Sequence, residues 1–147
     1  MHLITLDLHA RLQAALPGVT VLLPDEQQLP LQAAPVDAQG RPAVGTGERG
    51  LGTYLATRPE GYVQIERPVS AGVNDFMARW WITVAAIADH PDIAYALAET
   101  ARRALTGRPD EPGPYTRVLA DATQSIGTAS LCRSTYEITE LDGNPVI

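Results

Sequence analysis

The amino-acid sequence predicts an α+β fold: a mixed, mostly antiparallel sheet of about four to six strands, with two helices packed on one face. Residues 76–88 alternate over a long run as a strand does, and residues 91–106 carry apolar side chains at helical spacing. The other apolar runs are short and are separated by glycine or proline. With 147 residues, of which 45% are hydrophobic and 19% charged, the chain can bury the core of one domain spanning residues 1–147.

The N-terminal region begins with a predicted helix over residues 5–16, in which leucines recur at helical spacing and Thr5 can serve as the N-cap. A Pro-Gly pair ends this helix, and residues 19–23 form a short apolar run that predicts a strand. Proline and glycine then recur through residues 24–52, which excludes a continuous helix or a central strand there. We expect a long Pro/Gly-rich loop at about 24–52, and because such loops are often functional it is the first candidate for a binding surface.

The middle of the chain predicts the central strands of the sheet. Residues 53–57 can form a short strand, and residues 61–69 alternate more clearly. Residues 76–88 are apolar on both faces, which is typical of a central strand covered on each side. The adjacent Trp80 and Trp81 point to opposite faces of this strand. One of them is expected in the core, whereas the other either packs under a helix or marks a subunit contact.

The clearest predicted helix covers residues 91–106. Asp89 or His90 caps its start, a proline fits its first position, and a glycine follows its end. Two more strands follow at residues 115–126 and 131–141, joined by a turn of hairpin length. The predicted order is therefore helix, strand, loop, strands, helix and strands.

Several motifs suggest chemistry at first sight. Residues 45–50 match the Gly-x-Gly-x-x-Gly spacing of a dinucleotide-binding loop, but such a loop follows a strand and opens a helix, and the sequence predicts neither here. Asp89, His90 and Asp92 have metal-binding side chains, yet a helix start explains all three. Cys132 is expected to be a small core residue. The sequence thus predicts a flexible loop at the glycine motif, and no catalytic, cofactor-binding or metal-binding residue.

Charge and hydropathy narrow the classes of partner. The chain has 11 basic and 17 acidic residues, and its net charge of −6 disfavours binding to nucleic acid or to an anionic membrane surface. No apolar run approaches the roughly 18–20 residues of a membrane-spanning helix. The N-terminus lacks the features of a secretory signal, so we expect synthesis in the cytoplasm. Because no nucleophile, base and oxyanion site come together, a structural or interaction protein is expected rather than an enzyme.

Three blocks carry a resemblance to a known family: residues 61–67 (GYVQIER), 75–84 (DFMARWWITV) and 91–105 (PDIAYALAETARRAL). Together with an N-terminal helix that ends in Leu-Pro-Gly and a closing β-hairpin, they resemble the tail terminator proteins of long-tailed bacteriophages. The resemblance covers most of the chain and rests on the pattern and order of its elements. The Pro/Gly-rich stretch at residues 24–52 departs from the usual pattern of that family.

The resemblance implies a tail-terminator-like fold and a structural role in the virion. Such a subunit forms a homo-hexameric ring on the head-proximal end of the tail tube, stops tube polymerisation and contacts the neck. The implied partners are other copies of the chain, the tail tube protein and the neck or connector proteins, with no cofactor. Genomic DNA would pass through the bore without specific binding, and acidic residues along the bore would repel it.

The resemblance also suggests where contacts with other subunits or with the tube are made. We expect them at charged residues of the loop and of strand ends and at one exposed aromatic residue, namely Glu48, Arg49, Glu66, Arg67, Arg79 and Trp81. Two alternatives remain open. The chain can be another neck or tail-completion protein, or a small α+β module that holds a ligand against the sheet near Trp81; an enzyme ranks third.

Overall fold

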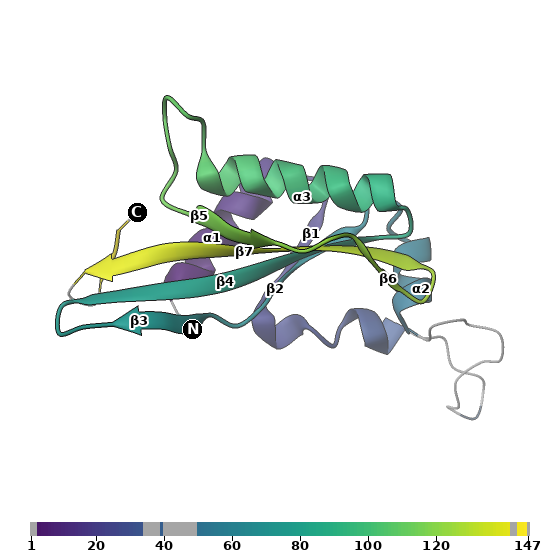
Figure 1. The fold of residues 1–147 in the computed structure, drawn as a ribbon. Helices are drawn as coiled ribbons and strands as arrows, with labels where there is room; N and C mark the ends of the chain where they lie inside the picture. Colours follow the sequence, from purple (N-terminus) through teal and green to yellow (C-terminus); the bar gives the residue numbers. More distant parts are fainter. Residues whose placement is uncertain (1–2, 34–38, 40–49, 142–143, 147) are drawn as a thin grey trace.

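The computed structural model describes residues 3–33, 39, 50–141 and 144–146. Its helices are α1 (Leu3–Ala15), α2 (Gly50–Ala56) and α3 (Pro91–Thr106), with two short 3-10 helices, η1 (Pro24–Glu26) and η2 (Pro30–Ala33). Its strands are β1 (Thr20–Leu22), β2 (Tyr62–Ile65), β3 (Val69–Val73), β4 (Met77–Ala88), β5 (Thr116–Ala120), β6 (Gln124–Ile126), β7 (Ala129–Leu141) and β8 (Asn144–Pro145). Helices α1 and α3 lie on one side of the sheet, and α2 lies toward the other (Figure 1).

A long antiparallel ribbon of β4 and β7 forms the centre of the sheet, and all 12 residues of β4 have a partner in β7. Two strands follow one another along the other edge of β4, first β2 and then β3. Along the edge of β7 that faces away from β4, β6 pairs with the start of the strand, β5 with its middle and β8 with its C-terminal end. Because β1 is parallel to β2 and the other pairs are antiparallel, the sheet is mixed, as the sequence predicts.

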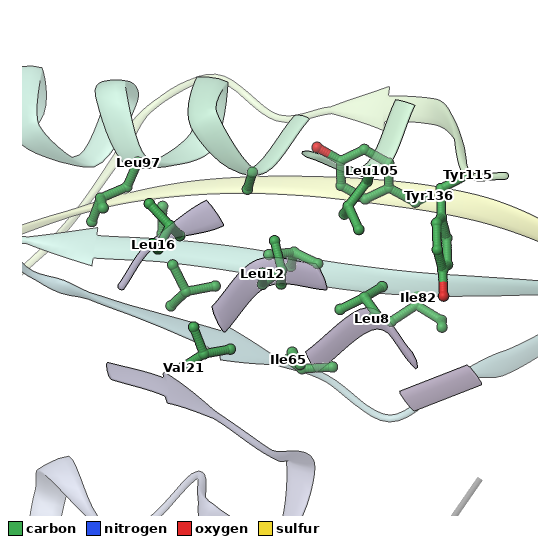
Figure 2. Packing of buried hydrophobic residues seen from close by; sticks show 14 of the residues in the cluster. Leu8, Leu12, Leu16, Val21, Ile65, Ile82, Leu97, Leu105, Tyr115 and Tyr136 are labelled. Atoms are coloured by element: carbon green, nitrogen blue, oxygen red, sulfur yellow. The ribbon is translucent and has the colours of Figure 1, made fainter. Parts of the chain in front are cut away.

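The main core lies between the sheet and helices α1 and α3 (Figure 2). Leu8 and Leu12 of α1 meet Leu105 of α3 and Ile82 of β4 there, and all four side chains are fully buried. Burying such a side chain contributes about 1.5–3 kcal/mol, so the leucine repeat of α1 accounts for its place on the sheet. Tyr115, which follows α3, closes this core.

The hydroxyl of Tyr115 donates a hydrogen bond of 2.8 Å to Oδ2 of Asp7 and so ties the segment after α3 to α1. Asp7 also accepts a hydrogen bond of 2.8 Å from Nε of Arg11, one helical turn further along. Burial, and then the bond to Asp7, raises the pKa of Tyr115. Burial and the hydrogen bond to Asp7 together hold Tyr115 in its neutral form.

A second, smaller core covers the opposite face of the same strands. Leu51, Tyr54 and Leu55 of α2 pack there against Ala85 and Ile87 of β4. Residues 82–88 of β4, the inner end of the ribbon, are therefore covered on both faces, as the sequence predicts for a central strand. Residues 77–81, the outer end, are largely exposed.

The helix at α3 is confirmed in detail. His90 is its N-cap, with Nδ1 accepting a hydrogen bond of 3.2 Å from the backbone N–H of Asp92, and Pro91 stands in its first turn. Gly107 ends the helix with a φ of 68°, a conformation that favours glycine. Of the two caps that the sequence allows, Asp89 and His90, the structure has His90.

Two expectations for the N-terminal half are wrong. Thr5 lies inside α1 and is 1% exposed, so it does not cap the helix, which already includes Leu3 and the fully buried Ile4. Residues 53–57 lie in or next to α2 and form no strand. The side chains of Leu51, Tyr54 and Leu55 lie on one helical face, and packing of that face on the sheet outweighs the low helix propensity of the two glycines in α2.

The α+β class is confirmed, but the predicted number of elements is too small. The described residues contain three α-helices and an eight-stranded sheet, where the sequence predicts two helices and about four to six strands. The predicted strand at 61–69 is divided into β2 and β3 at Pro68, which has no N–H to donate to the sheet. Likewise the strand predicted at 115–126 is divided into β5 and β6, and the stretch at 24–52 contains η1, η2 and the start of α2 in its described parts.

Candidate interaction surface

The face of the sheet opposite α1 and α3, here called the open face, carries several of the predicted contact residues. Ile82 and Val84 point to the main core, so Trp81 and Arg79 alternate onto the open face. Trp81 is 42% exposed, and its Nε1 donates a hydrogen bond of 2.9 Å to Oε2 of Glu137 on β7. Exposed aromatic and arginine side chains are typical of contact surfaces.

The two tryptophans are placed as the alternation predicts. Trp80 is partly buried against the main core, whereas Trp81 is exposed on the open face. Because Trp81 belongs to neither buried cluster of the described residues, the alternative that it packs under a helix does not hold. The subunit contact at Trp81 stays a prediction.

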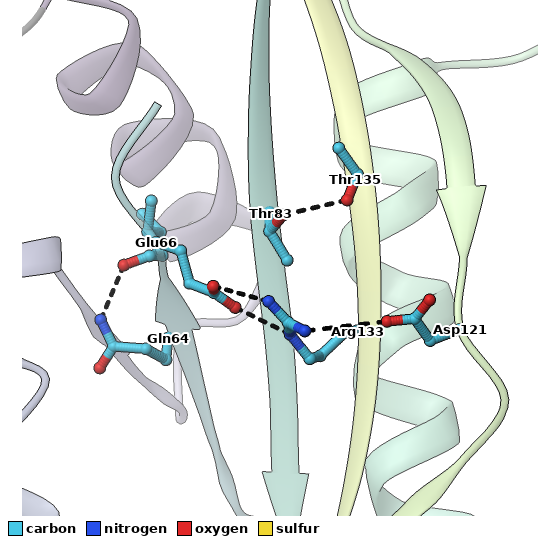
Figure 3. A network of polar contacts seen from close by, with 7 residues as sticks. Gln64, Glu66, Thr83, Asp121, Arg133 and Thr135 are labelled. Atoms are coloured by element: carbon cyan, nitrogen blue, oxygen red, sulfur yellow. Dashed lines mark hydrogen bonds and ion pairs between the residues drawn. The ribbon is translucent and has the colours of Figure 1, made fainter. Parts of the chain in front are cut away.

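Glu66 forms an ion pair within the chain. Its carboxylate accepts two hydrogen bonds from Arg133, of 2.9 Å from Nε and 2.7 Å from Nη2, and Arg133 also lies 3.9 Å from Asp121 (Figure 3). The hydrogen bond to Glu66 is the main cause that raises the pKa of Arg133. This pair joins β2 to β7 across β4, next to a hydrogen bond of 2.9 Å between the hydroxyls of Thr83 and Thr135.

The sequence did not identify Arg133 as a site residue. Its position becomes significant only through the register of β7, which sets it opposite Ala85 and on the same face as Glu66. No local pattern around residue 133 carries that information. The two residues lie 67 positions apart in the chain.

The remaining predicted contact residues lie toward the outer end or outside the described residues. Arg67 is exposed just before β3, and the guanidinium of Arg79 lies beside Gly72, where an added Cβ would be 3.3 Å from Nη2. Glu48 and Arg49 lie outside the described residues.

Apolar side chains are exposed around these arginines, which the sequence did not predict. Phe76 is 73% exposed and Val73 is 72% exposed, although the alternation assigns Phe76 to the core-facing side. The reason is visible in Figure 1, where the outer end of the ribbon extends past α1 and α3. Val69, Met77 and Leu141 are exposed at the same end.

A hollow of about 380 Å³ lies at the inner end of the open face. Gln64 lies in its wall with its Nε2 donating to the carbonyls of Leu23 (2.9 Å) and Ile65 (2.7 Å), and its Oε1 has no hydrogen-bond partner among the described residues. The wall combines apolar side chains with amides and the Glu66–Arg133 pair; its residues are Gln27, Leu31, Leu51, Tyr62, Gln64, Glu66, Ala85, Ile87, Gln124, Ile126, Leu131 and Arg133.

The glycine-rich motif has a structural explanation at its last position. Residues 45–49 lie outside the described residues, but Gly50 begins α2, so the expectation that no helix follows the motif is wrong. A side chain at Gly50 would collide with the carbonyl of Leu31 in η2. Close contact between η2 and α2 therefore accounts for this glycine without a phosphate.

No family model and no curated protein matches the chain. Within the described residues, no helix is both long and apolar enough to cross a membrane. The described residues also contain no group of three or more side chains suited to hold a metal ion. The described residues form an α+β protein with an extended mixed sheet, one end of which is exposed on its open face.

Proposed function

We propose that the chain is a structural virion protein, a phage tail terminator that forms a ring on the tail tube and joins it to the neck. The observation that carries the proposal is the outer end of the β4–β7 ribbon. Its strands are fully paired with each other, yet large apolar side chains remain exposed there, Phe76 and Val73 most of all. Such a surface is expected of a subunit that completes its burial on assembly.

The shape of the subunit also supports assembly into a ring. Head-to-tail contacts that close into a ring join two different patches of each subunit, so the subunit needs a projecting part and exposed edges. The ribbon projects beyond its helices, and β3 and β5 are edge strands of the sheet (Figure 1). Arg79 and Trp81 lie on β4 of this ribbon, and Arg67 lies just before the neighbouring β3. Residues of these types are enriched where subunits meet.

Electron microscopy of particles made without this gene tests the proposal. A terminator stops tube growth, so we expect overlong tubes that fail to join heads. Tubes of normal length that fail to join heads would indicate another neck or tail-completion protein instead. Joined tails of normal length would contradict both.

A complementation experiment links this outcome to the outer end of the ribbon. Phe76→Lys places a charge on the exposed ribbon end, and we expect it to restore fewer joined tails than the unchanged chain does. Tyr95→Lys is the matched control, because Tyr95 is 60% exposed on α3, away from the ribbon. Equal complementation by both variants would mean that the ribbon end makes no essential contact.

The hollow of about 380 Å³ favours a second candidate, a small ligand-binding module. It lies on the open face as that alternative requires, although at the inner end of the ribbon rather than beside Trp81. Thermal unfolding against a panel of small metabolites tests it, since a bound ligand raises the melting temperature. A rise that Ile126→Arg abolishes, because it fills the hollow, would favour this candidate; no rise with any compound would count against it.

A further inference from the structure

Strands β3 and β5 are open edges on opposite sides of the sheet. Each is an edge strand in the described part of the chain, and most of their residues are exposed. Soluble proteins usually protect such edges with charge or proline, because unpaired N–H and C=O groups recruit further strands. Strand β3 contains neither, and Arg117, the one charged residue of β5, lies 3.6 Å from Glu99 of its own chain.

The directions of these edges are complementary. Strand β4 is antiparallel to both β3 and β7, and β7 is antiparallel to β5. Strands β3 and β5 therefore run in opposite directions. When two copies lie side by side in the same orientation, β3 of one and β5 of the other meet as an antiparallel pair, which continues the alternation of the sheet.

The exposed side chains of the two edges also match. Residues that lie directly opposite each other in a sheet point to the same face. Val69 is paired with Trp81, and Leu119 with Thr135, so the side chains of Val69 and Leu119 both lie on the open face. Each of them is 57% exposed. Val73 on one edge and Val118 on the other are exposed as well, so pairing of the edges would remove apolar surface of both copies from water.

Each edge strand has a single irregularity in its pairing with the strand next to it. The register shifts between Ser70 and Gly72 in β3, and between Arg117 and Leu119 in β5. Two registers place side chains of the same face opposite one another. In the first register, Val69 lies opposite Leu119. In the second, called the displaced register, the second copy is moved two residues toward the outer end and Ser70 lies opposite Ala120. In the first register, β6 of the second copy would reach the side of β2 that β1 already occupies. The displaced register moves β6 two residues toward the outer end, away from most of β1.

The charges next to the edges have opposite sign. Arg67 lies two residues before Val69, and Asp121 lies two residues after Leu119. In the first register Arg67 lies directly opposite Asp121. In the displaced register Asp121 lies opposite Val69, two residues along the strand from Arg67. This attraction favours a second copy in this orientation.

We propose that copies of this chain associate head to tail by antiparallel pairing of β3 in one copy with β5 in the next. The pairing supplies the heterologous contact that a closed ring needs, and in that respect it rests on the proposed function. The continuous sheet of the assembly would cover the edges that a lone subunit leaves open.

Disulfide trapping tests the pairing directly. Two double variants, S70C with A120C and V69C with L119C, place one cysteine on each edge and cover both registers. They are oxidised as purified protein at high concentration and in particles complemented with the variant. The native Cys132 is buried and stays in place, so the unchanged chain is the background control.

Head-to-tail pairing predicts a ladder of cross-linked species from at least one double variant, ending at a closed ring, and none from the corresponding single variants. A dimer from S70C or V69C alone would show that β3 pairs with β3 and would overturn the proposal. Absence of cross-linking in both purified protein and particles would also overturn it.

These outcomes separate the pairing from the function. A ladder from purified protein, together with joined tails of normal length in particles lacking the gene, would support the edge pairing and reject the tail-terminator role. Overlong tubes without any ladder would do the opposite. The two proposals can therefore fail independently.

Discussion

The two ends of the β4–β7 ribbon share the same antiparallel pairing and differ in what covers them. At the inner end, α1 and α3 pack on one face and α2 on the other, and Ile82 is fully buried. At the outer end, the paired strands extend past the helices, and Val73 and Phe76 are among the most exposed apolar residues of the described chain. Backbone pairing therefore continues where burial stops, and the two ends should respond differently to the same change.

The largest difference is expected for removal of apolar side chains. Ile82→Ala leaves a cavity in the main core and should lower the free energy of unfolding by about 2–5 kcal/mol. Val73→Ala at the outer end removes exposed methyl groups and should change it by less than about 0.5 kcal/mol. Urea unfolding of both variants measures the contrast, and similar losses would mean that the outer end is part of the stable core.

Two glycines, one at each end of the sheet, differ in the space and backbone conformation around them. Gly61, which precedes β2, has a φ of 78°, and an added Cβ would lie 2.5 Å from the carbonyl oxygen of Ile87. Gly61→Ala should therefore cost about 1–3 kcal/mol, because the strained conformation and the clash add. Gly72→Ala in β3 meets only the flexible end of Arg79 and should change stability by less than about 1 kcal/mol. Thermal unfolding of the two variants checks this, and an equal loss in both would refute it.

Alkaline pH should weaken the covered part of the sheet through its buried tyrosines. Burial raises the pKa of Tyr62 and of Tyr136 to about 12, from an ordinary value of 10.0. Because the folded chain favours the neutral phenols, their contribution is complete below about pH 10 and is lost as the pH rises toward 12. The free energy of unfolding should fall there by roughly 1 kcal/mol per pH unit for each tyrosine.

Urea unfolding at a series of pH values from neutral to strongly alkaline measures this decline. Tyr62→Phe provides the control, because it removes one of the titrating groups and should make the decline shallower. An unchanged slope in that variant would contradict the assignment to Tyr62.

The smallest effect is expected on the open face of the inner end, where Glu66 and Arg133 pair across β4. Both side chains are about one-third exposed, so water and salt screen the pair despite its two hydrogen bonds. A double-mutant cycle with Glu66→Gln and Arg133→Gln should give a coupling energy of about 1 kcal/mol that declines with added salt. A coupling near zero at low salt would mean that the pair contributes nothing to joining β2 and β7.

The sequence alone determined the features that depend on neighbouring residues. The alternation of residues 76–88, the apolar stripe of α3 and its cap at His90 are local patterns, and the structure confirms each of them. The same local reasoning placed Trp80 and Trp81 on opposite faces and so identified one exposed aromatic residue of the candidate surface. Alternation and capping are set within a few residues, which is why a single sequence suffices for them.

Only the tertiary structure decided which of these segments is covered and which residues meet. Residues 53–57 were predicted as a strand, but the apolar face of α2 gains more by packing on the sheet than its glycines lose as a helix. The Glu66–Arg133 pair, the hollow at the inner end and the exposure of Phe76 depend on strand register and on where the helices end. The strand register, and the parts of the sheet that the helices cover, are set by contacts between segments far apart in the chain. A pattern of neighbouring residues therefore does not predict them.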